Sequence, residues 1–97
     1  MLYLVFYDIE KDQSRTKVAK ALVAQGFERL QFSVFCGLEN PKELTGLWSK
    51  FKTMLDEKTD KLYVLKISKT SLKSMAVLGV LDMDLDYLAG DKESMFF

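Results

Sequence analysis

Residues 2–8 read LYLVFYD, six consecutive apolar residues followed by a carboxylate. Alternate side chains of an extended segment point to opposite sides, Leu2, Leu4 and Phe6 to one and Tyr3, Val5 and Tyr7 to the other. A strand that is apolar on both sides is covered on both sides, which predicts a central strand. Asp8 follows on the Leu2 side, where the interior opens to solvent. A carboxylate there ends the strand, joins an ion pair or binds a metal, and this segment alone favours the first.

Length and composition predict one folded domain over residues 1–97. Hydrophobic residues make up 48% of the 97 residues, which argues against a disordered chain. The formal net charge is zero, which argues against a histone-like binder of nucleic acid. Residues 1–55 carry eight Lys or Arg against six Asp or Glu, whereas residues 56–97 carry six against eight. Any anion-binding surface is therefore expected mostly in the first half.

Cys36 is the only cysteine, and the sequence contains no histidine. This excludes an intrachain disulfide, zinc sites of the Cys/His kind, and Ser–His or Cys–His nucleophile pairs. An enzyme of this composition would work through carboxylates, a hard metal such as Mg²⁺, Tyr or Lys. No apolar run is long enough to cross a membrane, and no basic segment precedes the first strand. We therefore expect a soluble cytoplasmic protein without a signal peptide.

The first helix is expected after a polar turn. Asp12 or Ser14 would cap it, it would run to about Gln25, and Gly26 would end it. Its buried stripe consists of small and aliphatic residues: Val18, Ala19, Ala21 and Leu22. Arg15 lies near that stripe in the first turn, where a cation opposes the helix dipole. It therefore needs an anionic partner, either Asp8 or a phosphate.

Residues 27–38 alternate as extended structure, either one long strand or two short strands joined by a sharp bend. One side would carry Leu30, Phe32, Val34 and Cys36, and the other Arg29, Gln31, Ser33 and Phe35. The first of these sides is taken to face the core, so Cys36 is predicted to be a buried, inert thiol.

The second helix is expected to begin with Asn40 as its cap and Pro41 as its first residue. Apolar residues recur at helical spacing and predict its core stripe: Leu44, Leu47, Trp48, Phe51, Met54 and Leu55. A polar turn over residues 56–60 and a strand over residues 62–67 would follow.

This order of elements predicts an α+β fold, a split βαββαβ unit whose antiparallel sheet carries both helices on one face. The other face would be bare, and it is predicted to carry the side chains of Tyr3, Val5, Tyr7 and Phe35. Aromatic residues in that number imply a partner surface, and a twofold homodimer is the simplest one.

Residues 68–97 are an extension of this unit, with a short helix over residues 71–77, an acidic loop and an apolar end. That end is expected to dock as an added strand on a sheet edge, the chain's own or its partner's. Four acidic residues fall at the spacing of a calcium-binding loop: Asp82, Asp84, Asp86 and Glu93. Tyr87 stands where that loop requires glycine, which favours a solvated acidic loop instead.

The other candidate site combines Asp8, Tyr7, Arg15, Arg29 and Phe35. A twofold axis through the bare face would bring two copies of Asp8 together, and two carboxylates can hold one divalent ion that activates water and clamps a phosphodiester. Arg15 and Arg29 would neutralise phosphate oxygens, and Phe35 or Tyr7 would stack on a base. The alternative is a structural ion pair within an aromatic dimer interface, and residue chemistry alone favours that alternative.

The sequence around these residues resembles CRISPR-associated protein 2, a family of small adaptation nucleases found beside CRISPR arrays. The resemblance rests on Tyr7-Asp8-Ile9, on Arg15 seven residues after Asp8, and on the stretch RLQFSVF at residues 29–35. Further residues that match the family are Val18, Ala19, Leu22, Gly26, Tyr87, Leu88, Met95, Phe96 and Phe97.

The resemblance implies a ferredoxin-like homodimer whose sheets pack face to face, with an extra C-terminal strand from residues 68–97 docked on the partner. It implies one Mg²⁺ shared by the two copies of Asp8, with Tyr7, Arg15, Arg29 and Phe35 as further catalytic residues. Members are described as Mg²⁺-dependent endonucleases of single-stranded RNA or double-stranded DNA. They also bridge copies of the CRISPR-associated integrase (protein 1) during spacer acquisition.

Three functions remain open. In the first, Asp8 is a working metal ligand and the protein is a phosphodiesterase that cleaves nucleic acid. In the second, the protein is a DNA-binding adaptor without catalysis, and surface cations bind phosphates: Arg15, Lys17, Lys20, Lys50 and Lys52. Lys17 stands where members often carry a second Arg, and Lys cannot form a bidentate fork on phosphate. In the third, the protein is a toxin-like ribonuclease of the virulence-associated family. The set of Asp8, Tyr7 and Arg15 favours the first.

Overall fold

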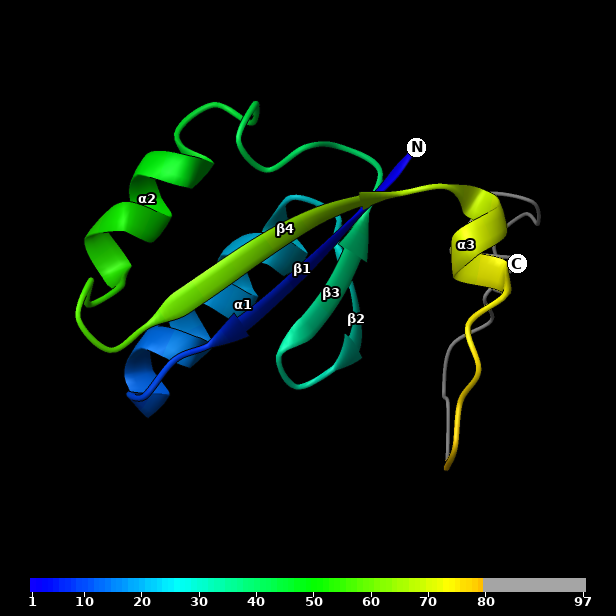
Figure 1. Ribbon diagram of the computed structural model, residues 1–97. Helices are drawn as coiled ribbons and strands as arrows, with labels where there is room; N and C mark the ends of the chain where they lie inside the picture. Colours follow the sequence, from blue (N-terminus) through cyan, green and yellow to red (C-terminus); the bar gives the residue numbers. More distant parts are fainter. Residues whose placement is uncertain (80–97) are drawn as a thin grey trace.

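The computed structural model describes residues 1–79, which form a four-stranded antiparallel sheet with two helices on one face (Figure 1). The elements are β1 (Leu2–Asp8), α1 (Asp12–Ala24), β2 (Glu28–Gln31), β3 (Val34–Gly37), α2 (Leu47–Met54), β4 (Lys61–Ile67) and α3 (Lys69–Lys73). The strands lie in the order β2-β3-β1-β4, so β1 is central, as its apolar sequence predicts. This is the predicted ferredoxin-like βαββαβ arrangement.

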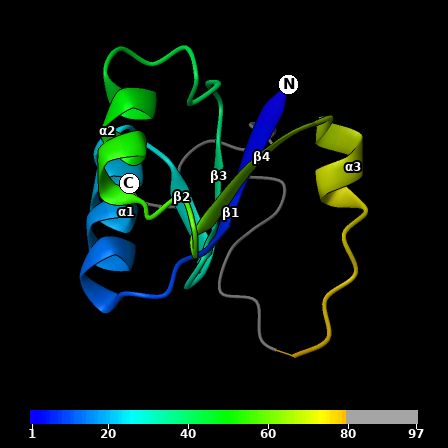
Figure 2. The same cartoon turned by 60° about the vertical axis from the view of Figure 1, so that its left-hand side comes forward.

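Helices α1 and α2 lie on one side of the sheet, and the short α3 lies on the other (Figure 2). No helix within residues 1–79 is long and apolar enough to cross a membrane. The predicted acidic loop with its calcium-like spacing and the C-terminal strand fall in residues 80–97, outside the described residues.

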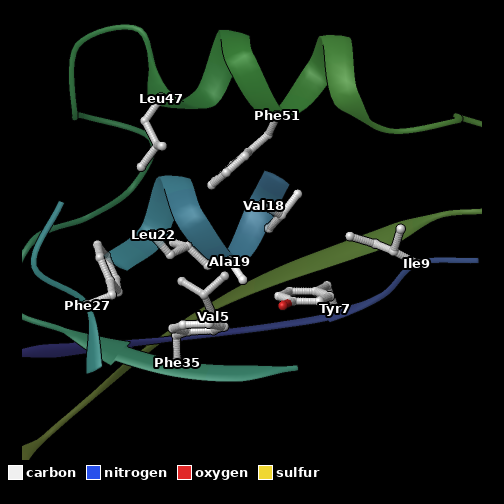
Figure 3. Packing of buried hydrophobic residues seen from close by; sticks show 10 residues of the cluster. All are labelled: Val5, Tyr7, Ile9, Val18, Ala19, Leu22, Phe27, Phe35, Leu47 and Phe51. Atoms are coloured by element: carbon white, nitrogen blue, oxygen red, sulfur yellow. The ribbon is translucent and has the colours of Figure 1, made fainter. Parts of the chain in front are cut away.

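The main core lies between the sheet and helices α1 and α2. Figure 3 shows Val5, Tyr7 and Phe35 pointing from the strands toward these two helices. The core residues on the helices are those of the predicted stripes: Val18, Ala19, Leu22, Leu47 and Phe51. Val5 and Phe35 are completely buried there.

The prediction that Tyr3, Val5, Tyr7 and Phe35 occupy the bare sheet face is therefore wrong. Both sides of β1 are apolar, so alternation alone could not identify which side the helices cover. The face without α1 and α2, here called the open face, carries the even-numbered side chains of β1 and their neighbours in β3 and β4: Leu2, Leu4, Phe6, Asp8, Val34, Cys36, Tyr63, Leu65 and Ile67.

A second, smaller core cluster covers one end of the open face. Leu72 of α3 packs against Leu2 and Cys36, and all three are buried. Cys36 is thus a buried thiol as predicted, but under α3 rather than under α1 and α2. Burial raises the pKa of this thiol to about 11, so it is protonated and unreactive at neutral pH. Helix α3 begins two residues before the expected start, because the Ser68 hydroxyl accepts a hydrogen bond from the Ser71 N–H and caps it.

The segments around α1 follow the sequence closely. Gly26 adopts a left-handed backbone with φ of +88° just after α1, which is the predicted role of glycine at a helix end. Residues 27–38 form two short strands rather than one, joined by a turn at Phe32 and Ser33. At the start of α1, Lys11 occupies the cap position and makes no side-chain cap, so the predicted Asp12 or Ser14 cap is not formed.

Helix α2 begins six residues later than the Asn40-Pro41 signal indicates. The Asn40 carboxamide accepts a hydrogen bond from the Lys42 N–H at 3.0 Å, as a helix cap would. Gly46 then takes a left-handed conformation with φ of +77° and interrupts the turn, so the regular helix starts only at Leu47. Leu44 and Trp48 still pack against the core, which confirms the apolar stripe.

Asp60 joins the loop after β1 to the turn before β4. Its carboxylate accepts hydrogen bonds from the N–H groups of Glu10 at 3.0 Å and Asp56 at 2.9 Å. The hydrogen bond from Asp56 and then that from Glu10 hold the pKa of Asp60 below its ordinary value. The folded state therefore favours the carboxylate, and this stabilisation is present above the ordinary pKa of about 4 and lost as the pH falls through the folded value.

We expect Asp60→Asn to lower the melting temperature at neutral pH, with the difference from the wild type shrinking as the pH falls below about 4. The neutral amide cannot provide the two charged acceptor oxygens. Thermal melts across this pH range check the result, with Glu57→Gln in the same exposed turn as the matched control. A difference that stays constant with pH would contradict the role given to the Asp60 charge.

Candidate functional site

Asp8 is the last residue of β1, and its side chain is exposed at the edge of the open face. Its even-numbered position places it on the same side as Phe6, whose ring stacks on Tyr63 of β4 at 4.9 Å between centroids. Lys61 is the residue paired with Asp8 across β1 and β4. Asp8 therefore combines access to solvent with a position beside an apolar surface.

Three of the other predicted site residues, Tyr7, Arg29 and Phe35, meet on the helix side of the sheet. The Tyr7 ring stacks on Phe35 with 6.2 Å between centroids, and the Arg29 guanidinium lies 5.1 Å from the centroid of Phe35. The Tyr7 hydroxyl and Arg29 Nη2 both donate to the Phe32 carbonyl oxygen, at 3.1 and 2.9 Å. These residues fix the hairpin turn between β2 and β3 to the central strand.

Burial limits what this group can contact. Phe35 is completely buried and Tyr7 is 6% exposed, so neither ring offers a face to a base. Burial raises the pKa of Tyr7, while the positive charge of Arg29 acts in the opposite direction. The phenol is therefore protonated at neutral pH and acts as a hydrogen-bond donor.

Arg15 holds the loop that follows Asp8. Its Nη1 donates to the carbonyl oxygens of Ile9 at 2.8 Å and Glu10 at 3.1 Å, and its guanidinium forms an ion pair with Asp12. The anionic partner that the sequence demands is thus Asp12, one turn away on the same helix, rather than Asp8.

The predicted phosphate-binding residues fall into two groups. Arg15, Lys17 and Lys20 lie along α1, whereas Lys50 and Lys52 are exposed on α2. Beside α1 lie two adjoining hollows, of about 430 and 480 Å³, which share Thr16 and Arg29. We call them together the hairpin groove, and their full lining is Asp12, Arg15, Thr16, Ala19, Lys20, Val23, Ala24, Arg29 and Phe32.

The alternating pattern of residues 27–38 does not predict that Phe32 is exposed. The pattern assigned it to an apolar side with Leu30 and Val34, yet its ring is 88% exposed. The signal that could have found it is the need for a turn if residues 27–38 form two strands, since Phe32 lies at the centre of that stretch.

Within residues 1–79, Asp8 is the carboxylate assigned to the predicted metal site. Among the residues described, no three His, Cys, Asp or Glu side chains come together to hold a metal ion. Carboxylate and water oxygens are the donors that Mg²⁺ takes in proteins. The exposed carboxylate of Asp8 is thus a donor of the kind that Mg²⁺ takes, and the other donors of such a site would have to be added to it.

Comparisons with known proteins identify the family. The family model described as CRISPR associated protein Cas2 matches residues 1–75. CRISPR-associated endoribonuclease Cas2 2 of Pyrobaculum aerophilum is 35% identical over 79 residues, which span 81% of this chain and 87% of that protein. A Cas2 endoribonuclease of Chloroflexus aurantiacus is 34% identical over 80 residues, which span 81% of this chain and 85% of that one.

Solved structures agree with these matches. The crystal structure of Streptococcus pyogenes Cas2 superposes with a TM-score of 0.67 at 28% identity, covering 81% of this chain and 100% of that one. A hypothetical protein of Thermus thermophilus superposes with a TM-score of 0.67 at 32% identity, covering 84% of this chain and 94% of that one. The chain therefore belongs to the Cas2 family of CRISPR-associated proteins.

Proposed function

We propose that this protein is a Mg²⁺-dependent endonuclease of single-stranded RNA or double-stranded DNA that acts in spacer acquisition with the CRISPR integrase. The observation that carries the proposal is the exposed carboxylate of Asp8 at the end of β1, beside an apolar sheet face. The naming of the curated relatives as endoribonucleases supports it.

The working unit in this proposal is a homodimer formed through the open face. Phe6, Val34, Tyr63 and Leu65 give that face an apolar surface, with Tyr63 46% and Leu65 50% exposed. Exposed apolar side chains in one patch favour a partner surface, and a twofold axis pairs the patch with itself. Two copies of Asp8 would then lie at the same interface, where they would be the residues that hold one Mg²⁺.

Mg²⁺ at such a site supplies a Lewis acid for the phosphodiester and lowers the pKa of water. Asp8 would hold the ion, and Lys61 on the neighbouring strand would offer an ammonium to a phosphate oxygen. Arg15 keeps the Asp8 loop in place through the Ile9 and Glu10 carbonyls, and Tyr7, Arg29 and Phe35 keep β1 joined to the hairpin. Arg15, Arg29, Tyr7 and Phe35 are thus positioning residues in this account.

The test is cleavage of labelled single-stranded RNA and double-stranded DNA by the full chain, with Mg²⁺ and with EDTA. The proposal expects cleavage of at least one substrate with Mg²⁺ and none with EDTA. Equal cleavage in EDTA would exclude the metal-dependent reaction.

A DNA-binding adaptor without catalysis is the second candidate. Its support is that no group of three metal-ligating side chains lies within residues 1–79, whereas Lys17, Lys20, Lys50 and Lys52 are exposed on the two helices. Retention of duplex DNA by the dimer, without cleavage under any metal condition, would favour the adaptor.

A further inference from the structure

Phe32 presents an aromatic ring to solvent at a fixed place. It lies in the turn between β2 and β3, and its ring is 88% exposed. Turns of this kind usually take Gly, Asn, Asp or Ser, so the turn itself does not require an aromatic residue. The backbone beneath the ring is held by the hydrogen bonds that its carbonyl oxygen accepts from Tyr7 and Arg29.

One face of the ring already has a cationic neighbour. The Arg29 guanidinium lies 5.6 Å from the ring centroid of Phe32 and 5.1 Å from that of the buried Phe35. Arg29 is thereby anchored between the core and the turn, and it limits the rotation of the exposed ring. The Phe32 ring is thus a pre-organised flat surface next to a fixed positive charge.

The hairpin groove beside Phe32 is basic although the chain as a whole is neutral. Arg15, Lys20 and Arg29 line it, and Lys17 lies with Lys20 along a further hollow on the same face of α1. Asp12 is the one acidic residue among those lining residues, and it pairs with Arg15. This excess of positive charge, with the Thr16 hydroxyl between the two hollows, suits a chain of phosphates.

We propose that Phe32 is a stacking platform for an unpaired base of a single-stranded nucleic acid whose phosphates follow the hairpin groove along α1. The proposal rests on the proposed function, since it assumes that the protein binds nucleic acid, and it names the strand type that this surface takes. A base inside a duplex has both faces covered by its neighbours, so only an unpaired base offers a face to an exposed ring. In this arrangement the nucleic-acid strand binds on the helix side of the sheet, whereas Asp8 lies on the open face.

The experiment measures binding of a short labelled single-stranded RNA to the full chain in EDTA by fluorescence anisotropy. Phe32→Ala is expected to weaken binding by about 5- to 100-fold, the range typical of losing one base–aromatic stack. Phe32→Trp is expected to retain wild-type affinity, because indole stacks at least as well. Leu38→Ala is the matched control, since Leu38 is 68% exposed and lines a different hollow.

A second readout follows stacking directly. An RNA carrying one fluorescent base analogue is expected to lose emission when the wild type binds it, and not when Phe32→Ala binds it. If the wild type binds RNA and all three variants bind it with the same affinity, Phe32 is not a stacking platform. That result would not contradict the proposed nucleic-acid function. No binding of RNA or duplex DNA by the wild type would overturn both. Loss of the dimer mass in Phe32→Ala would show instead that the ring contacts a second copy.

Discussion

Asp8→Ala is expected to lower Mg²⁺-dependent cleavage at least about 100-fold, since loss of even an outer-shell partner costs metal sites 10- to 100-fold. In the proposed site, the substitution removes the exposed carboxylate that would bind Mg²⁺. Asp8 is exposed at the end of β1 and takes part in neither core cluster, so folding and dimer mass should be unchanged. Initial rates on the preferred substrate, with light scattering of the same samples, measure both outcomes.

Asp8→Asn and Glu10→Gln sharpen this comparison. Asn keeps the size of the side chain but removes its charge, so it should lose as much activity as Ala. Glu10→Gln neutralises an exposed carboxylate two residues away and should leave the rate unchanged. Cleavage by Asp8→Ala at the wild-type rate would exclude Asp8 as the metal ligand and would point to a contaminating nuclease.

Phe35→Ala is expected to lower the free energy of unfolding by about 3–5 kcal/mol, the usual cost of removing a buried phenylalanine ring. Phe35 is completely buried and packs against Tyr7 and beneath Arg29. A domain of this size has a total stability of about 5–15 kcal/mol, so the variant should lose at least about 10 °C in melting temperature. Urea denaturation followed by circular dichroism measures the change.

Phe32→Ala is the matched control for this experiment. It removes the same ring from an exposed site three residues away, and the expected loss is less than about 1 kcal/mol. Equal losses in the two variants would contradict the burial of Phe35. A stable Phe35→Ala protein that no longer dimerises would support the interface position that the sequence pattern predicts for Phe35.

The sequence predicts the order of elements because each has a local signal. The LYLVFYD run marks the central strand, Gly26 ends the first helix, and the stripe through Leu47 and Phe51 identifies the second. The predicted start of α2 is wrong. The Asn40-Pro41 signal does form a turn, but the left-handed Gly46 prevents that turn from continuing as a helix.

The prediction of which side of β1 faces the helices is wrong for a physical reason. In an amphipathic strand, polar residues mark the exposed side, so the buried side can be identified from the sequence. β1 is apolar on both sides and gives no such signal. Alternation therefore predicts Tyr7 and Phe35 on the open face, whereas their side chains lie under α1 and α2. Alternation nevertheless predicts correctly that Asp8 shares a side of the strand with Leu2, Leu4 and Phe6.

The arrangement of the site depends on contacts that no local pattern encodes. The Tyr7 hydroxyl reaches the Phe32 carbonyl 25 residues away, and the Arg29 side chain meets that same atom. A spacing in the sequence can suggest that Arg15 and Arg29 accompany Asp8, but it cannot show that their guanidinium groups already bind backbone carbonyls. The structure thus brings Tyr7, Arg29 and Phe35 together and leaves Asp8 on the opposite side of the sheet.

The stoichiometry of metal binding shows whether two chains share one ion through Asp8. Titration of the wild-type protein with Mn²⁺, followed by electron paramagnetic resonance, counts bound ions per chain, and Mg²⁺ competition shows that both ions use one site. A site shared by two chains predicts one ion for every two chains in the wild type and none at this site in Asp8→Ala. One ion per chain, or unchanged binding by Asp8→Ala, would contradict it.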